Sequence, residues 1–274
     1  LSSKRYALLL EYDGTDYAGW QRQNNARSVQ GTAEKALSKM IKTKIHLYGC
    51  SRTDAGVHAR GHVSHFDADC KVPTERIPLA LASLLPPDIS CLAAAEVPPD
   101  FHARFDPVGK QYSYYIWNHR RKSALLHRYT EQEGRPLDLA AMREAAALLV
   151  GRHDFRGFMA SGSTSKITVR HIHKLEISGE SGGLIRIQIA GDGFLYNMVR
   201  IIAGTLMYIG LGKLEQQDLQ QMLEKGDRTL GGKTLGPQGL FLDKVFYRKN
   251  PFGACYNIAE HMPQFLKGRE EERK

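Results

Sequence analysis

The spacing of apolar residues in this chain predicts the same order of elements twice: strand, helix, strand, strand, helix, strand. In the first run, short apolar stretches indicate strands, and apolar residues three or four apart indicate helices. Strands are expected near 5–12, 45–50, 62–68 and 89–97, and helices near 29–43 and 77–84. This order predicts an α+β fold built from two tandem ferredoxin-like β-α-β-β-α-β units.

The second run is longer than the first. Tyr112, Tyr114 and Ile116 alternate with Tyr115 and Trp117, as residues on the two faces of a strand do. Further strands are expected near 168–178, 184–190 and 240–247, and helices near 139–149, 194–209 and 215–224. The sequence therefore predicts an N-terminal half at 1–105, a C-terminal half at 106–250, and a tail at 251–274 that we expect to be flexible.

The composition is that of a basic globular protein. With 274 residues, of which 42% are hydrophobic, the chain can form one large or two medium domains. Its 38 Lys and Arg against 29 Asp and Glu leave a net charge of +9, which favours a polyanionic partner, although scattered solvated lysines produce the same charge.

Cysteine spacing and hydropathy restrict the cellular location and the kinds of site that the chain can carry. The four cysteines form no C-x-x-C pair, so neither a zinc site nor a disulfide framework is expected, and a reducing cytoplasm is the simplest location. Apolar runs long enough to span a membrane and a secretory signal are both missing from the sequence, so we expect no membrane association.

Residues 50–59 read Cys-Ser-Arg-Thr-Asp-Ala-Gly-Val-His-Ala and place Asp54 in a polar turn between two apolar stretches. We expect Asp54 to be ionised at neutral pH, because a nearby arginine favours the charged form of a carboxylate. Such a carboxylate can act as a nucleophile, an acid or base, or a metal ligand. Most loop Asp-Ala-Gly segments only cap a turn or a helix, so these residues alone leave both interpretations open.

The stretch Arg-Thr-Asp-Ala-Gly-Val-His-Ala at 52–59 resembles the active-site motif of the tRNA pseudouridine synthase A family. Other blocks resemble the remaining motifs of that family, in the same order: Tyr12-Asp13-Gly14-Thr15, Gly19-Trp20-Gln21, Phe101-His102-Ala103-Arg104-Phe105, Tyr112-Ser113-Tyr114, Met198-Val199-Arg200 and Gly239-Leu240. The resemblance covers nearly the whole chain. Two positions depart from it, since Ser51 replaces the usual glycine and His62 the usual glutamine.

The resemblance implies a fold and an activity. The two halves would join into one extended, mostly antiparallel sheet with a basic cleft, the pseudouridine synthase fold. The enzyme would be an isomerase that converts uridine to pseudouridine at positions 38, 39 and 40 of the tRNA anticodon stem-loop. The reaction needs neither a cofactor nor a metal. Bacterial members of the family act as homodimers, so a cytoplasmic homodimer that binds tRNA is expected.

The resemblance also implies roles for individual residues. Asp54 would be the nucleophile, and Arg200 its charged partner. Tyr112 would stack on the target base and assist proton removal from C5, and Leu240 would form an apolar wall of the pocket. Arg52 would enter the RNA and take the space of the flipped base. Basic residues near these motifs are candidate phosphate contacts: Arg22, Arg60, Arg104 and Lys110.

Each of these assignments has a plainer alternative. Arg200 would then be an ordinary helix arginine that reaches solvent, but its neighbours at 194–209 are so apolar that pairing with an acid is expected. Tyr112 and Leu240 would be core residues. The candidate phosphate contacts would be solvated surface charges, and Trp20 would pack rather than stack on RNA.

Two rival functions remain open from the residues. The first is a metal site formed by His58, His62 and His65, or by His171 and His173, but these residues have no partner Cys pair and no H-E-x-x-H pattern. The second is a catalytically silent RNA-binding protein on the same fold, which would follow if Ser51 or His62 disrupts the site.

Overall fold

A computed structural model of the chain describes residues 3–162 and 165–253, and these form two compact units. Unit 1 comprises the described residues up to Val108 and those from Phe241 on, and unit 2 comprises Gly109–Leu240. The fold is mixed α+β with mostly antiparallel sheet, as predicted. Of the tail expected at 251–274, all but the first three residues lie outside the described residues. The predicted junction of the two halves and the basic cleft concern the arrangement of the units and stay predictions.

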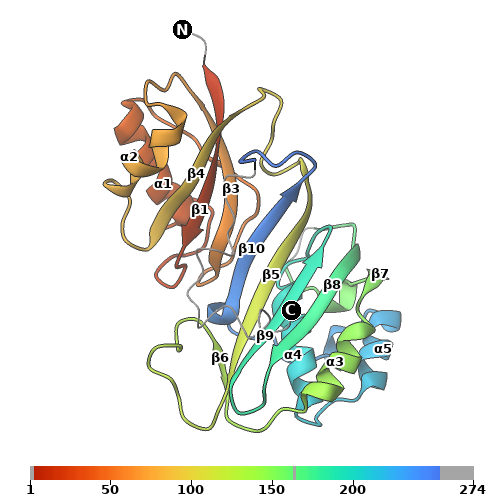
Figure 1. The fold of residues 1–274 in the computed structure, drawn as a ribbon. Coiled ribbons are helices and arrows are strands. Elements are labelled where there is room, and N and C mark those ends of the chain that lie inside the picture. Colours follow the sequence, from red (N-terminus) through yellow and green to blue (C-terminus); the bar gives the residue numbers. More distant parts are fainter. Residues whose placement is uncertain (1–2, 163–164, 254–274) are drawn as a thin grey trace, which may run out of the picture. The chain divides into compact units, whose positions relative to one another are not determined.

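Unit 1 is a sheet with two helices beside it (Figure 1). Its strand order is β4-β1-β3-β10. β1 is antiparallel to both β3 and β4, whereas β10 runs parallel to β3, with Phe241 opposite His58. The elements are β1 (Lys4–Tyr12), α1 (Val29–Ile41), β2 (Tyr48–Gly49), β3 (His58–Ala68), a 3₁₀ turn (Thr74–Arg76), α2 (Ile77–Ala82), β4 (Ile89–Val97) and β10 (Leu240–Tyr247).

The strand expected at 45–50 is wrong in its extent, because β2 is only two residues long. The backbone N–H of Ile45 donates to Ser38 Oγ at 2.9 Å, and that of Leu47 donates to Glu34 Oε1 at 3.0 Å. Side chains of α1 therefore take the hydrogen bonds that a neighbouring strand would supply. Ile45 and Leu47 are still buried, which is why their pattern is typical of a strand.

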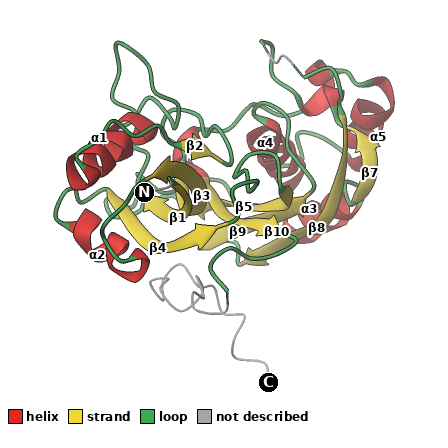
Figure 2. Cartoon of the chain, turned by 90° about the horizontal axis from the view of Figure 1, so that it is seen from above, coloured by secondary structure: helices red, strands yellow, loops and turns green. Residues whose placement is uncertain are grey.

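Unit 2 contains strands in the order β5-β9-β8-β7, and these neighbours are antiparallel. Helices α3, α4 and α5 gather on one side of these strands in Figure 2, and α3 contacts both β8 and α4. Two of its short strands, β6 and β7, were not predicted. The elements are β5 (Pro107–Asn118), β6 (Glu131–Glu133), α3 (Leu139–Ala147), β7 (Gly151–Asp154), β8 (Val169–Gly179), β9 (Leu184–Gly191), α4 (Met198–Gly210) and α5 (Gln216–Lys225), with 3₁₀ turns at Arg156–Phe158, Arg228–Leu230 and Pro237–Gly239.

Helix α4 begins four residues later than the pattern predicts. Asn197, which precedes its first residue, has a left-handed backbone with φ of 59°. Asparagine tolerates this conformation better than other side chains, but a helix cannot continue through it. The apolar side chains at 194–197 therefore belong to a turn that leads into α4. In the part of the chain that the structure describes, none of the helices has the length and hydropathy needed to cross a membrane.

Candidate active site

Asp54 lies in the loop that connects β2 to β3, and the backbone of this loop is held on several sides. The N–H of Trp20 donates to the carbonyl oxygen of Thr53 at 3.0 Å, and the hydroxyls of Tyr12 and Thr53 are 2.8 Å apart. The N–H of Val57 donates to the carbonyl oxygen of Asp54 at 3.2 Å and closes the turn. The half-buried carboxylate is therefore presented by a loop of fixed shape.

Two glycines bring neighbouring loops against the Asp54 loop. A Cβ atom at Gly14 would lie 2.0 Å from the carbonyl oxygen of Val57, and one at Gly19 would lie 2.6 Å from that of Thr53. Gly19 also has φ of 92°, which other residues rarely adopt. The blocks Tyr12-Asp13-Gly14-Thr15 and Gly19-Trp20-Gln21 thus accompany the Asp54 segment because their backbones contact it.

The two positions that depart from the family pattern contact each other. The imidazole of His62 is fully buried, and its Nε2–H donates to the carbonyl oxygen of Ser51 at 3.0 Å. Its ring stacks on Trp20 at 3.6 Å between centroids, and Trp20 is itself 3% exposed. Trp20 is therefore a packing residue, and His62 anchors the start of the loop that carries Asp54.

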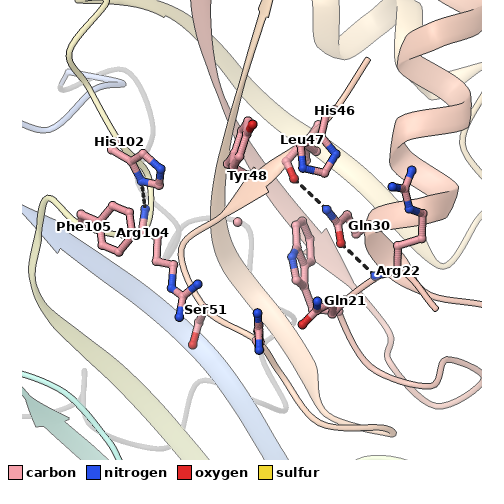
Figure 3. Close-up of a pocket in the computed structure, with 13 residues that line it drawn as sticks. Gln21, Arg22, Gln30, His46, Leu47, Tyr48, Ser51, His102, Arg104 and Phe105 are labelled. Atoms are coloured by element: carbon pink, nitrogen blue, oxygen red, sulfur yellow. Dashed lines mark hydrogen bonds between the residues drawn. The ribbon is translucent and has the colours of Figure 1, made fainter. Parts of the chain in front are cut away.

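Three of the predicted RNA contacts line one cavity of unit 1, which Figure 3 shows. Arg22, Arg52 and Arg104 lie around a space of about 330 Å³. All three side chains are exposed, and Arg22 also pairs with Glu34 at 3.0 Å. The sequence gives these residues no shared pattern, so their convergence is a finding of the tertiary structure.

Arg104 belongs to a loop that is anchored through its neighbour Ala103. The N–H of Ala103 donates to His65 Nδ1 at 3.1 Å, and its carbonyl oxygen accepts from the Tyr247 hydroxyl at 2.7 Å. Burial and the nearby His102 lower the pKa of His65 to about 4. His65 is therefore neutral at pH 7, as an imidazole that accepts a hydrogen bond must be.

Arg60 differs from the other candidate phosphate contacts. It is 4% exposed, and its Nη1 donates to Asp243 Oδ1 at 2.5 Å. Its guanidinium also lies 4.1 Å from the centre of the Phe241 ring. A charge that is buried and paired in this way is poorly placed to bind a phosphate, so Arg60 is not among the RNA contacts proposed below.

Strand β5 of unit 2 carries Tyr112 and Lys110. Tyr112 is 7% exposed, and its ring meets Phe194 edge to face at 5.2 Å between centroids. Phe194 belongs to the turn that leads into α4, so this turn contacts the strand that carries Tyr112. Lys110 is half-buried on the same strand.

Arg200 lies in the first turn of α4, and its guanidinium is oriented from two sides. Its Nε donates to the carbonyl oxygen of Leu235 at 2.7 Å, and its Nη1 donates to Asn197 Oδ1 at 2.8 Å. The N-terminus of a helix carries a partial positive charge, which adds to that of the guanidinium. This corner of unit 2 therefore favours an anion.

Glu131 is a supporting residue that the sequence did not indicate. It is 9% exposed, and its Oε2 accepts from the N–H of Gly236 at 3.2 Å and from Gln238 Nε2 at 3.0 Å. The Tyr114 hydroxyl donates to the carbonyl oxygen of Gly236 at 2.7 Å, and burial raises the pKa of Tyr114 well above its usual value. Together these groups fix the segment between Leu235, which holds Arg200, and Leu240, which is buried.

Within residues 3–162 and 165–253, the histidines show no arrangement typical of a metal centre. Among the residues that the structure describes, no group of three His, Cys, Asp or Glu side chains could hold a metal ion. His171 and His173 are exposed, with ring centres 4.3 Å apart.

A family model described as tRNA pseudouridine synthase matches residues 9–106 and 145–248 of this chain. The chain belongs to this family of isomerases. Proteins named tRNA pseudouridine synthase A are similar to it over most of its length. The protein from Ruminiclostridium cellulolyticum is 44% identical over 89% of this chain and 100% of the relative. The protein from Acetivibrio thermocellus is 45% identical over 88% and 98%, and that from Clostridium acetobutylicum is 43% identical over 89% and 100%.

Proposed function

We propose that this enzyme forms pseudouridine at positions 38, 39 and 40 of the tRNA anticodon stem-loop, with Asp54 as the nucleophile. One observation above all supports the assignment of Asp54. Its loop is fixed by hydrogen bonds and close backbone contacts from two other family motifs, so the backbone that carries this carboxylate is held in one place. A catalytic group needs such fixed placement, whereas an aspartate that only caps a turn does not.

The chemistry is an isomerisation, so every atom of the uridine is kept. The bond from ribose C1′ to N1 breaks, the uracil turns within the site, and a bond from C1′ to C5 forms. The proton leaves C5 and N1 gains one. A carboxylate can attack the sugar carbon or remove a proton, and neither step requires an oxidant or a metal.

Residues of unit 2 would complete the site. Arg200 would pair with Asp54, which is supported by its place in the first turn of α4, where an anion is favoured. Tyr112 would stack on the target base, and Leu240 would form an apolar wall. Two of these three side chains, Tyr112 and Leu240, are buried and stand on regular strands, which gives them defined positions.

The RNA has to be opened before the base can react, at a cost of a few kcal/mol. Arg52, exposed two residues before Asp54, would occupy the space that the flipped base leaves. Arg22, Arg104 and Lys110 would bind phosphates, since charged side chains that reach solvent can neutralise the backbone. The enzyme would act in the cytoplasm as a homodimer that binds tRNA, as expected for the family.

The test is pseudouridine formation in tRNA by the wild type and by Asp54→Asn, mapped by position. The variant should lose at least about 10⁴-fold in turnover but bind tRNA within a few fold, because the RNA contacts are mostly to phosphate. Asp69→Asn, at an exposed site on the same unit, is the matched control and should stay fully active. Turnover retained by Asp54→Asn would exclude it as the nucleophile, and an inactive wild type that binds tRNA would indicate a silent RNA-binding protein.

A further inference from the structure

The cavity that Arg22, Arg52 and Arg104 line has a strongly one-sided charge. His46 and His102 lie on its wall as well, and no aspartate or glutamate is found among the described residues that line it. Arginine side chains around a concave surface raise the local potential and attract anions. The cavity therefore selects for a negatively charged ligand.

The carboxylate of Glu34 lies behind the wall, pairs with Arg22 and lies 2.9 Å from His46 Nδ1, so it offsets part of the positive charge of the cavity. Glu34 of α1 is 4% exposed, and its Oε1 accepts from the N–H of Leu47 at 3.0 Å and from Gln30 Nε2 at 3.2 Å. Its Oε2 accepts from Arg22 Nη1, whose side chain nevertheless remains 53% exposed. Glu34 thus fixes the wall from inside, and Arg22 is still able to meet a ligand.

Two aromatic rings in the same cavity are far more exposed than core packing requires. Tyr48 is 46% exposed and Phe105 is 73% exposed. Tyr48 stacks with one face on the buried His65, at 5.0 Å between centroids, and Phe105 contacts His102 at 4.3 Å. Exposed aromatic rings in a basic groove are the arrangement with which proteins bind single-stranded nucleic acids.

We propose that this cavity binds one unpaired nucleotide of the RNA substrate, other than the uridine that reacts. Its base would stack on Tyr48 or Phe105, and its phosphate would lie against Arg22 and Arg104. A space of about 330 Å³ is at the lower end of the range for small-ligand sites, so it suits one nucleotide and not a duplex. This inference rests on the proposed function, since it takes the substrate to be RNA.

The cavity would bind a base with little preference for which base it is. The amide of Gln30 could otherwise read a base edge, but its Oε1 accepts from the N–H of Arg22 and its Nε2 donates to the carbonyl oxygen of Leu47 (Figure 3). Apart from the exposed amide of Gln21 and the two histidines, the main attractions are stacking and charge, and both tolerate any base. The enzyme can therefore hold stem-loops of different sequence in this way.

The cavity also shares a loop with the candidate nucleophile. Ser51 and Arg52 line the cavity, and Asp54 follows two residues after Arg52. Two residues of extended chain span at most about 7 Å. A nucleotide bound in the cavity would therefore lie beside the loop that carries Asp54, and it would help to set which uridine reacts.

The test uses the full-length protein and a fluorescent anticodon stem-loop RNA whose loop nucleotides are replaced one at a time by an abasic nucleotide. For the wild type, one position other than the target should lose roughly 5- to 100-fold in affinity, as expected for a lost stack. The double variant Tyr48→Ala/Phe105→Ala should bind intact RNA more weakly than the wild type by a similar factor. Its affinity should not fall further when the abasic nucleotide stands at that position. Leu79→Ala, which removes an apolar side chain that is 76% exposed outside the cavity, is the control.

Several results would overturn the proposal. One is that no abasic position in the loop other than the target weakens binding by the wild type. Another is that the abasic nucleotide weakens binding by the double variant as much as it weakens binding by the wild type. A third is tight binding of uridine 5′-monophosphate that the double variant abolishes, since the cavity would then be a site for free nucleotides. Circular dichroism of the variants checks that they fold. Pseudouridine formation by the wild type is measured separately, so that an inactive enzyme contradicts the proposed function while the abasic series still tests the cavity.

Discussion

The two units hold their candidate catalytic residues in different ways. In unit 1, Asp54 stands on a loop, and backbone groups of neighbouring loops fix it through contacts that glycines permit. In unit 2, Tyr112 and Arg200 stand on a strand and a helix, and the side chain of Glu131 fixes the segment that holds Arg200. In unit 1 the support comes from backbone contacts at glycines of the motifs, whereas in unit 2 it comes from a side chain that belongs to none of the motifs.

This difference explains which supports can be recognised from sequence. Gly14 and Gly19, which contact the Asp54 loop, belong to short motifs. Glycine is required there because two backbones approach so closely that no side chain fits between them. The contacts of Glu131 need only a buried carboxylate at the right place in space, and many sequences could supply one. Supports of the first kind leave a pattern, and supports of the second kind do not.

Among changes to the residues that support the site, Gly14→Ala in unit 1 should have the largest effect. The new Cβ would lie 2.0 Å from the carbonyl oxygen of Val57, so the Asp54 loop has to move. We expect a loss of about 2 to 4 kcal/mol in stability and of about 100-fold or more in pseudouridine formation. Gly134→Ala, whose Cβ would have no neighbour closer than 3.7 Å, is the control. Normal turnover in Gly14→Ala would mean that the loop is not held by backbone contact.

Acidic pH should lower the free energy of unfolding of unit 1, because unfolding allows His65 to take up a proton. The folded pKa of about 4 lies below the ordinary value of 6.5, so the unfolded chain binds the proton more readily. This contribution to stability is complete above about pH 6.5 and is lost as the pH falls toward 4, by up to about 3 kcal/mol. Urea unfolding at a series of pH values measures it.

His65→Asn is the matched variant for this pH series. Asparagine can still accept from the N–H of Ala103 but does not titrate, so its stability should depend less on pH between 4 and 6.5. An equal slope for both proteins would show that His65 is not the group responsible.

Removing Glu131 tests the support of unit 2. Glu131→Ala leaves the N–H of Gly236 without its acceptor, which should cost about 1 to 3 kcal/mol in thermal or urea unfolding. Because the segment that holds Arg200 loosens, kcat should fall about 10-fold with little change in KM. Glu131→Gln keeps an acceptor oxygen and should recover most of both effects. Equal losses in the two variants would point to charge rather than positioning.

The smallest effect is expected for Arg104→Gln at the rim of the cavity. Binding should weaken by about 10-fold for all stem-loops alike, and the slope of log affinity against log salt should fall by about one, as for a single lost phosphate contact. Arg76→Gln, at another exposed site of unit 1, should change neither quantity. An unchanged salt dependence in Arg104→Gln would remove this residue from the phosphate contacts.

Most of the regular elements were predictable, because their apolar residues face one core. The strand at 89–97 and the alternation at Tyr112–Trp117 follow directly from side-chain periodicity. The segment at 45–47 was not, since its backbone bonds to side chains of α1 while its apolar residues stay buried. Periodicity reports burial, and it does not report which group takes a backbone hydrogen bond.

The alternation of elements, the family motifs and Asp54 as the leading candidate can all be recognised from short stretches of sequence, because each depends on residues close together in the chain. Other features are visible only in the folded chain: His62 anchors Ser51, and Arg60 pairs with Asp243. In the folded chain, too, three arginines share a cavity with two exposed rings: Arg22, Arg52 and Arg104. Those contacts join residues from distant segments of the chain. The packing of strands and loops sets the distances between such residues, and a local sequence pattern does not encode that packing.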